Sequence, residues 1–271
     1  MGTEFTWGGG SAAASTFGWG TASGESSAFW TLLSVEAGRA LPFAGDGRSE
    51  MDDLVDTCHI LAFEGHGTGL SGQVSMRVDD GLIVTQKLGF GLSEVSKEST
   101  LTINKELEVI FGNGIPNPAN RFHFSIYDFR PEIKCVVHTH PFYSSAVSIL
   151  GKPLLINHMD HMILYGITGF INSWPGVPIS FDEGDLFCGY LRDKDCLLLS
   201  NHGLLVLGKT VREACVRAVA FERAAKLHLA TMSIENISLV EEKLAAEARS
   251  WLSSPARINA TFQFYRRMCC R

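Results

Sequence analysis

The chain has 271 residues, of which 45% are hydrophobic and 19% are charged, so it can bury a large core and is not globally disordered. Its formal net charge is -6, and a mildly acidic chain lacks the positive surface that binds nucleic-acid backbones or anionic lipid. We expect no nucleic-acid partner, and no membrane partner because no apolar run reaches the roughly 18 to 20 residues of a membrane span.

Residues 1–47 are rich in Gly, Ser and Ala, and they lack the basic start and continuous apolar run of a signal peptide. We predict a flexible tail here and a single domain over residues 48–271, with a helical C-terminal segment. The seven cysteines form no CxxC pair, and several lie in apolar runs. This usage indicates buried, reduced thiols and therefore a cytoplasmic protein.

The first predicted elements of the domain are a helix and a β-hairpin. Apolar residues recur at helical spacing from 51 to 61, which predicts an amphipathic helix that ends near Gly65. Residues 73–78 alternate like a strand, and 82–85 are typical of the returning strand after turn residues at 79–81.

The later segments alternate between short apolar strands and helices. In chain order, we predict a helix around 122–129, a buried strand at 135–137, a helix that ends at Gly151, strands at 196–199 and 204–207, a helix from 211 to about 234, and further helix over 241–249. Thr210 and Glu213 are expected to form a capping box at the start of the 211–234 helix. These elements predict the α/β class, as three α/β/α layers around a mainly antiparallel sheet.

Three histidines lie at the ends of predicted strands. His138 and His140 are two residues apart after a buried strand, so the two-residue period directs both side chains to one face. His202 and Gly203 occupy a tight turn between the strands at 196–199 and 204–207. If the strands pair, the three imidazoles form a divalent-metal site with an open position. The alternative is a polar strand edge, which is the more common origin of an isolated His-x-His.

The segments around these histidines carry a family resemblance. Residues 130–141, which end in His138-Thr139-His140-Pro141, resemble the "RPDv..vvHtH" signature of the class II aldolase/adducin family. Residues 201–222 are similar to its "HHGl...G...eA...lE" block, and residues 71–77 are similar to its "sGN.SvR" turn. The resemblance extends in order from about residue 51 to residue 230, so it covers most of the predicted domain.

The resemblance implies a three-layer α/β/α fold that assembles as a homotetramer with active sites between subunits. It also implies a divalent ion held by His138, His140 and His202. We expect Zn²⁺ first, with Mn²⁺, Fe²⁺, Co²⁺ or Ni²⁺ as alternatives. Family members catalyse aldol cleavage, epimerisation, dehydration or decarboxylation of small molecules, and the metal stabilises an enediolate or enolate.

The chain departs from the family's sugar-phosphate aldolases in one segment. Their "PSSE/D" motif, which supplies phosphate ligands and a catalytic acid, corresponds to Pro116-Asn117-Pro118-Ala119-Asn120 here. We therefore expect a non-phosphorylated hydroxy-acid, oxo-acid or carbonyl substrate. Residues 157–162 resemble the "HQE" segment of the family's thioribulose-phosphate dehydratases and the "QD" of its decarboxylase-like members, which makes Asp160 the expected proton-transfer residue. The alternative is that Asp160 only orients a neighbouring histidine.

Further candidates lie near these segments. For catalysis they are His161 and Tyr165, and for substrate binding they are Gln73, Arg77, Lys87 and Tyr265. Arg77 and Lys87 suit a carboxylate, although a structural role for Arg77 on its strand is the alternative. Tyr265 is included, with its neighbours Phe264 and Arg266, because the C-terminal segment of family members can reach a neighbouring subunit's site.

The combined prediction is a metal-dependent lyase that acts by aldol-type cleavage or by decarboxylation. One alternative is a metal-dependent dehydratase, isomerase or cyclase on a similar substrate. The other is a non-catalytic, adducin-like binding module. Adducin-type heads have lost the metal histidines, whereas this chain has His138, His140 and His202, which favours an enzyme.

Overall fold

The computed structural model describes residues 47–173, 176 and 182–269. These residues belong to one folded unit, Phe43–Arg271. The predicted N-terminal tail, residues 1–47, lies outside the described residues except for Gly47.

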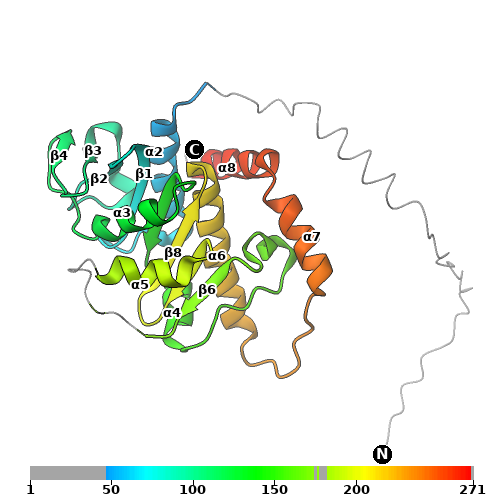
Figure 1. Ribbon diagram of the computed structural model, residues 1–271. Coiled ribbons are helices and arrows are strands. Elements are labelled where there is room, and N and C mark those ends of the chain that lie inside the picture. Colours follow the sequence, from blue (N-terminus) through cyan, green and yellow to red (C-terminus); the bar gives the residue numbers. More distant parts are fainter. Residues whose placement is uncertain (1–46, 174–175, 177–181, 270–271) are drawn as a thin grey trace, which may run out of the picture. The chain divides into compact units, whose positions relative to one another are not determined.

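The middle layer is a β-sheet, to which the described residues contribute eight strands (Figure 1). Their spatial order is β4-β3-β2-β1-β5-β8-β7-β6. The pair β6 and β7 is parallel and the other neighbouring pairs are antiparallel, which confirms the predicted sheet type. The strands are β1 (Gln73–Asp79), β2 (Leu82–Gln86), β3 (Thr100–Ile103), β4 (Val109–Phe111), β5 (Cys135–Thr139), β6 (Thr168–Ile171), β7 (Cys196–Leu199) and β8 (Gly203–Gly208).

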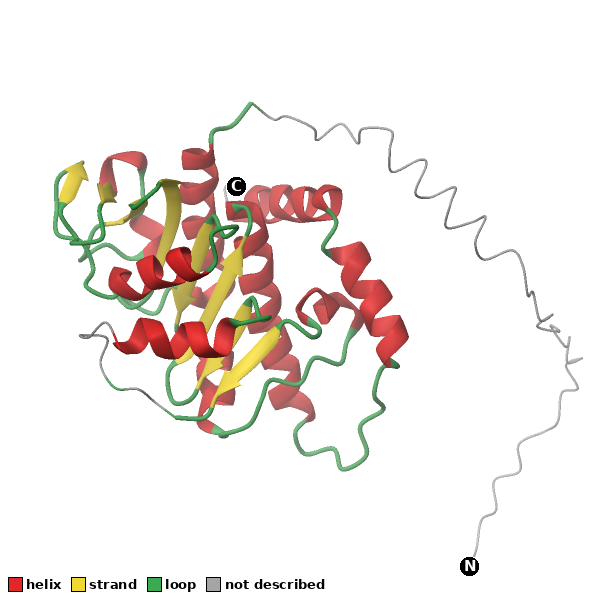
Figure 2. Cartoon of the chain, in the orientation of Figure 1, coloured by secondary structure: helices red, strands yellow, loops and turns green. Residues whose placement is uncertain are grey.

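Helices cover both faces of this sheet, which confirms the three layers (Figure 2). One face is covered by α3 (Asn120–Phe129) and α5 (Asp182–Leu191), and the other by α2 (Glu50–Leu61), α6 (Val211–Thr231) and α8 (Pro255–Cys269). The remaining helical segments are η1 (Ala62–His66), η2 (Leu92–Glu94), η3 (Lys97–Ser99), α4 (Phe142–Ile149), η4 (Met159–Leu164) and α7 (Glu242–Leu252).

The central strands alternate strictly between two hydrophobic clusters. In β5, Cys135 and Val137 pack in the cluster under α2, α6 and α8, and Val136 packs in the cluster under α3 and α5. Successive side chains of a strand point to opposite faces, so His138 shares the face of Val136. The Phe122 ring of α3 lies edge-on to the His138 ring, with 5.4 Å between centroids, which agrees with this placement.

The predicted elements are present, with differences at the helix ends. The helix predicted to about residue 234 ends at Thr231, and the helix predicted over 241–249 is the separate α7. The expected capping box is half formed. Thr210 Oγ1 accepts from the Glu213 backbone N–H at 3.1 Å, but Glu213 Oε2 accepts from Lys209 N at 2.7 Å instead of from Thr210 N.

Two further expectations concern compartment and membrane. The six cysteines among the described residues are all free, as the sequence indicated. In the described part of the chain, no helix is both long enough and apolar enough to cross a bilayer.

Candidate metal centre

The pairing of β5 with its neighbours brings the three histidines together. His138 lies near the end of β5, opposite Gln73 of β1 on one side and Leu205 of β8 on the other. His140 follows two residues later, and His202 lies in the turn between β7 and β8. Because β5 and β8 are neighbours in the sheet, this turn lies beside the end of β5.

The three imidazoles are close enough to hold one ion. Their ligand nitrogens all lie within 4.8 Å of one another, and their ring centroids are 4.6 to 4.9 Å apart. His138 Nε2 and His140 Nε2 face each other at 3.0 Å. Among the described residues, no other group of three His, Cys, Asp or Glu has this proximity.

The hydrogen bonds of the site leave nitrogen lone pairs for a cation. His138 Nδ1 donates to the Leu204 carbonyl oxygen at 2.9 Å, so its proton is on Nδ1 and its Nε2 carries the lone pair. His202 Nδ1 is buried and has no hydrogen-bond partner. Buried polar atoms without a hydrogen-bond partner are uncommon, and a metal ion bound by the histidines would supply the missing interaction. The donor set therefore fits a divalent metal ion.

The electrostatics of the site favour neutral imidazoles. Burial lowers the pKa of His138 well below its usual value, and the neighbouring His140 and His202 lower it further. Burial lowers the pKa of His140 as well, and with His140 nearby it lowers the pKa of His202 to about 4. All three rings are therefore neutral at pH 7, which is the state that binds a metal ion.

The turn that carries His202 is held by α4. The His202 backbone N–H donates to Ser148 Oγ at 3.2 Å, and Ser145 Oγ donates to the His202 carbonyl at 3.4 Å. Asn201 has a left-handed backbone with φ 54°, which asparagine tolerates better than most residues. These contacts fix the backbone position of His202 beside the end of β5.

Gly203→Ala is expected to damage the site directly. A Cβ at Gly203 would overlap the Thr139 carbonyl oxygen and lie 2.7 Å from His140 Cδ2. Neither neighbour is a flexible side-chain end, so the His140 ring must shift. We expect a loss of about 1–3 kcal/mol in unfolding free energy and of about tenfold or more in metal affinity. Denaturant unfolding and a competitive chelator titration measure the two losses. Gly189→Ala is the control, because a Cβ there meets nothing within 4 Å. Equal metal affinities in the two variants would contradict this account of the turn.

Gln73 is the sequence-predicted substrate contact that lies beside the histidines. Its side chain is 2% exposed and faces the same side of the sheet as His138, its cross-strand partner. Gln73 Oε1 accepts from Asn117 Nδ2 at 3.3 Å, while its Nε2 is buried without a partner. An amide donor is therefore available next to the metal site.

Arg77 and Lys87 are held by other parts of the chain. The Arg77 guanidinium donates to backbone carbonyls at the end of α3 and in the segment that leads into β5, namely those of Tyr127, Arg130, Pro131 and Ile133. These contacts correspond to the structural alternative for Arg77. Lys87 pairs through its backbone with Pro116, in the segment that replaces the family's acidic motif, and its ammonium lies over the Phe90 ring at 5.0 Å.

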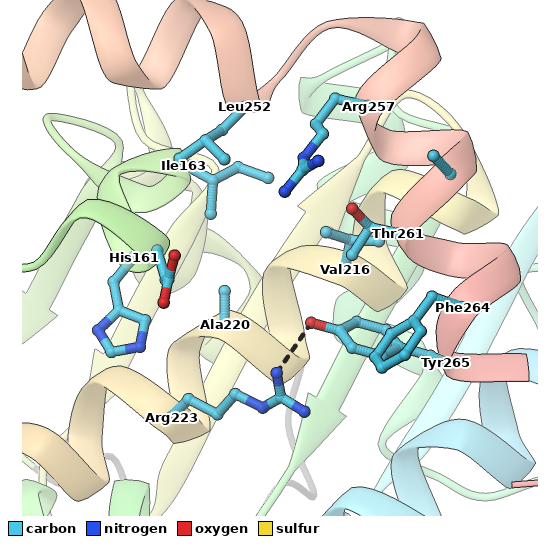
Figure 3. Close-up of a pocket in the computed structure, with 12 residues that line it drawn as sticks. His161, Ile163, Val216, Ala220, Arg223, Leu252, Arg257, Thr261, Phe264 and Tyr265 are labelled. Carbon is cyan, nitrogen blue, oxygen red and sulfur yellow. Dashed lines mark hydrogen bonds between the residues drawn. The ribbon is translucent and has the colours of Figure 1, made fainter. Parts of the chain in front are cut away.

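The remaining candidates gather in a different place. Asp160, His161 and Tyr265 line a pocket of about 350 Å³ between η4, α6 and α8 (Figure 3). The α6 residues Val216 and Ala220, which also line this pocket, belong to the hydrophobic cluster on the face of the sheet opposite His138. Tyr165 ends η4 outside this lining, and its carbonyl accepts from Arg249 at 3.0 Å.

Asp160 has no contact with the histidine triad within one chain. Its side chain is 82% exposed, and its carboxylate lies 3.8 Å from His158 Nδ1. Among the described residues no hydrogen bond or ion pair joins it to His138, His140 or His202.

Glu183 was not predicted from the sequence as a notable residue. It lies at the start of α5, is buried, and has an Oε1 atom without a hydrogen-bond partner. Burial raises the pKa of this carboxyl to about 7. A single Glu at the start of an unpredicted helix gives no sequence signal, because burial of this residue depends on how α5 packs.

Two buried histidines outside the triad make the stability of the fold dependent on pH. His66 bonds Thr139 Oγ1 at 2.8 Å, His123 bonds Ser75 Oγ at 2.7 Å, and burial lowers the pKa of each ring from 6.5 to about 3. Below pH 6.5 the unfolded chain protonates these rings and the folded chain does not. The contribution of these two neutral rings to the free energy of unfolding is therefore complete above pH 6.5, and it is lost as the pH falls toward 3.

His66→Gln is expected to reduce this pH dependence. Each buried histidine contributes a slope of about 1.4 kcal/mol of unfolding free energy per pH unit between about pH 6 and 4. Denaturant titrations at pH 7, 6 and 5 measure the slope, which falls by that amount in the variant even if the variant is less stable overall. His158→Gln, at a ring that is half exposed, serves as the control. An unchanged slope in His66→Gln would contradict the neutral buried ring.

Comparison with known proteins identifies the class. The family model of the Class II Aldolase and Adducin N-terminal domain matches residues 52–229, and the chain belongs to this family. Enzymes of the class II aldolase type are divalent-metal-dependent lyases that act on small molecules, and this protein is such an enzyme. The relatives named as aldolases favour an enzyme over a non-catalytic module.

The individual relatives agree with this class. The chain is 27% identical over 186 residues to an L-fuculose phosphate aldolase of Methanococcus vannielii, which covers 69% of this chain and 99% of that protein. It is 30% identical over 169 residues to the meiotically up-regulated gene 14 protein of Schizosaccharomyces pombe, covering 61% and 66%. In structure it resembles an L-fuculose 1-phosphate aldolase from Glaciozyma antarctica, with a TM-score of 0.72, 23% identity, and coverage of 81% and 87%.

Proposed function

We propose that the protein is a zinc-dependent lyase that cleaves or forms a C–C bond in a small, non-phosphorylated hydroxy-acid, oxo-acid or carbonyl compound. The observation that carries the proposal is the convergence of three neutral imidazoles, His138, His140 and His202, at the end of β5. A divalent ion at this site supplies stabilisation of the negative charge that develops on a substrate oxygen. Aldol-type cleavage and decarboxylation both need this stabilisation. Dehydration, isomerisation or cyclisation is the nearest alternative.

The segment at residues 116–120 favours a substrate without a phosphate group. It contains neither serine nor carboxylate, and the Asn117 amide already donates to Gln73. This segment therefore does not offer a substrate phosphate the side-chain hydroxyl donors that the family's "PSSE/D" motif provides. The names of the relatives favour a second candidate, a sugar phosphate such as L-fuculose 1-phosphate. Lys87, which pairs with Pro116, is the nearby cation that would favour it.

The protein's own groups have separate roles in this proposal. Gln73 Nε2, a buried donor without a partner beside His138, holds a substrate oxygen. Asp160 transfers the proton, with His161 and Tyr265 beside it in the same pocket. Tyr165 follows η4 and remains a weaker candidate.

We propose that the enzyme is a homotetramer with active sites between subunits. The support is the separation of the two groups of candidates within one chain. Asp160 and Tyr265 lie with the core layer opposite His138, so they serve a histidine triad only if it belongs to a neighbouring subunit. We further propose that residues 48–271 are a single catalytic domain, and, from the free cysteines, that the enzyme is cytoplasmic.

A substrate panel tests this function. Zinc-loaded protein is incubated with hydroxy-acids, oxo-acids and L-fuculose 1-phosphate, and NMR follows the products. We expect C–C cleavage or loss of CO₂ with members of the first two groups, and slower turnover of the phosphate ester. Turnover restricted to the phosphate ester would contradict the proposed substrate class, and elimination of water without C–C cleavage would favour the dehydratase alternative.

A further inference from the structure

One face of α8 presents a row of hydrogen-bond donors to the pocket beside α6. Arg257, Thr261 and Tyr265 are spaced four residues apart, so they lie along one side of the helix. Figure 3 shows the Arg257 guanidinium directed into the pocket, and Thr261 between Arg257 and Tyr265 along the helix. These side chains converge on a space of about 350 Å³, which accommodates a small organic molecule.

The donors of this row are free to bind a ligand. Among the described residues, the Arg257 guanidinium contacts the Trp251 ring, 4.7 Å away, and forms no hydrogen bond or ion pair. The Thr261 hydroxyl has no hydrogen-bond partner in the same part of the chain. Tyr265 accepts a hydrogen bond from Arg223 Nη1 at 3.2 Å, which leaves its own hydroxyl proton available for donation (Figure 3).

The rest of the pocket limits the ligand to a small molecule of mixed character. Val216 and Ala220 of α6 supply an apolar wall, and Asp160 supplies a carboxylate from η4. The second cation, Arg223, is already paired with Glu64 at 2.9 Å. Among the described residues that line it, the pocket therefore offers one cation without an ionic partner, two hydroxyl donors and one carboxylate acceptor.

We propose that this pocket binds a small hydroxy-carboxylate, whose carboxylate is held by Arg257, Thr261 and Tyr265 and whose hydroxyl donates to Asp160. A guanidinium with neighbouring hydroxyls matches a carboxylate in charge and in hydrogen-bond geometry. A phosphate dianion suits the pocket less, because the Asp160 carboxylate repels its second charge. The proposal shares Asp160, Tyr265 and the hydroxy-acid ligand class with the proposed function and rests on it in that respect, but ligand binding is measured without turnover, so a failure of the pocket is distinguishable from a failure of the proposed reaction.

Calorimetric titration of lactate, a hydroxy-carboxylate with a single negative charge, into the full-length chain tests the proposal. His140→Ala, which removes a triad ligand, provides a background in which a triad-bound metal cannot hold lactate, and wild-type protein dialysed free of metal provides a second background. We expect saturable binding of lactate in both, and binding of inorganic phosphate about tenfold weaker. Arg257→Gln is expected to weaken lactate binding about tenfold or more. Arg192→Gln, at an exposed arginine after α5, is the charge-matched control and is expected to change lactate binding less than twofold.

Thr261→Val provides a second variant that removes one donor and leaves the charge unchanged, and it is expected to weaken lactate binding about threefold or more. Equal lactate affinities in Arg257→Gln and Arg192→Gln, or no lactate binding at all, would overturn the proposal. Zinc-loaded wild type then separates two sources of the ligand. Binding that tightens with zinc and still requires Arg257 identifies the reaction's own substrate, and binding indifferent to zinc identifies a separate effector.

Discussion

His140→Ala is expected to abolish both metal binding and turnover while the chain stays folded. The variant removes one of three neutral nitrogens that lie within 4.8 Å of one another, and two remaining histidines no longer satisfy the three protein ligands of a catalytic metal site. The His140 ring is not part of either hydrophobic cluster, so its removal leaves the packing of the core unchanged. Metal content by mass spectrometry, turnover, and the circular dichroism melting curve measure the three properties.

His158→Ala is the matched control for this experiment. His158 lies outside the triad and is half exposed, so its removal should leave metal content unchanged. Retained turnover in purified, metal-analysed His140→Ala would be incompatible with catalysis at the triad. Loss of the folded state in that variant would instead direct the test to His202→Ala, whose ring lies in the turn outside both strands.

Asp160→Asn is expected to slow turnover by about 100-fold or more with metal content unchanged, because the amide keeps the shape of the side chain but cannot transfer a proton. The side chain is 82% exposed, so the substitution is not expected to affect folding. Steady-state kinetics at several pH values and metal analysis measure the effect. Asp193→Asn, at a carboxylate that is 78% exposed and paired with Lys194, is the control. An unchanged rate in Asp160→Asn would leave Asp160 with an orienting role only.

Mixing the two inactive variants tests whether Asp160 acts on the triad of another subunit. In an oligomer refolded from equal amounts of His140→Ala and Asp160→Asn, about a quarter of the shared sites have both residues intact. We therefore expect recovery of up to that fraction of wild-type turnover. If both residues acted within one chain, no site in the mixture would be complete, and the mixture would remain inactive.

The histidine triad could be predicted from the sequence because local rules determine its parts. The two-residue period places His138 and His140 on one face, and a tight turn next to Gly203 brings His202 to the strand end. The continuous apolar runs of the central strands predict their burial on both faces. The pairing of β5 with β8 could only be assumed, and the structure supplies it.

The location of the Asp160 segment could not be predicted in this way. Its resemblance to a family motif predicts a catalytic role but does not predict where the segment lies in the fold. In the structure, η4 packs against α6 on the face of the sheet away from His138. Only the tertiary fold shows that Asp160, Arg257 and Tyr265 share a pocket, because about a hundred residues of chain separate Asp160 from the other two.

The missed elements have weak local signals. Helix α5 contains Gly184 and Gly189, which lower helix propensity, and a Cβ at Gly184 would overlap Ser125 of α3. Close packing against α3 therefore stabilises a helix that its sequence does not favour. Strand β6 has only four residues, including Gly169, and pairs in parallel with β7 at the edge of the sheet. A short strand of this kind lacks an alternating pattern.

X-ray absorption spectroscopy of the zinc-loaded protein, with and without a bound hydroxy-carboxylate, tests the central claim most directly. The account predicts one zinc ion per chain, three imidazole nitrogens at about 2.0–2.1 Å, and an oxygen position that changes when the ligand is added. A zinc ion with four protein ligands that does not respond to the carboxylate, or a folded protein that binds no divalent metal, would contradict it.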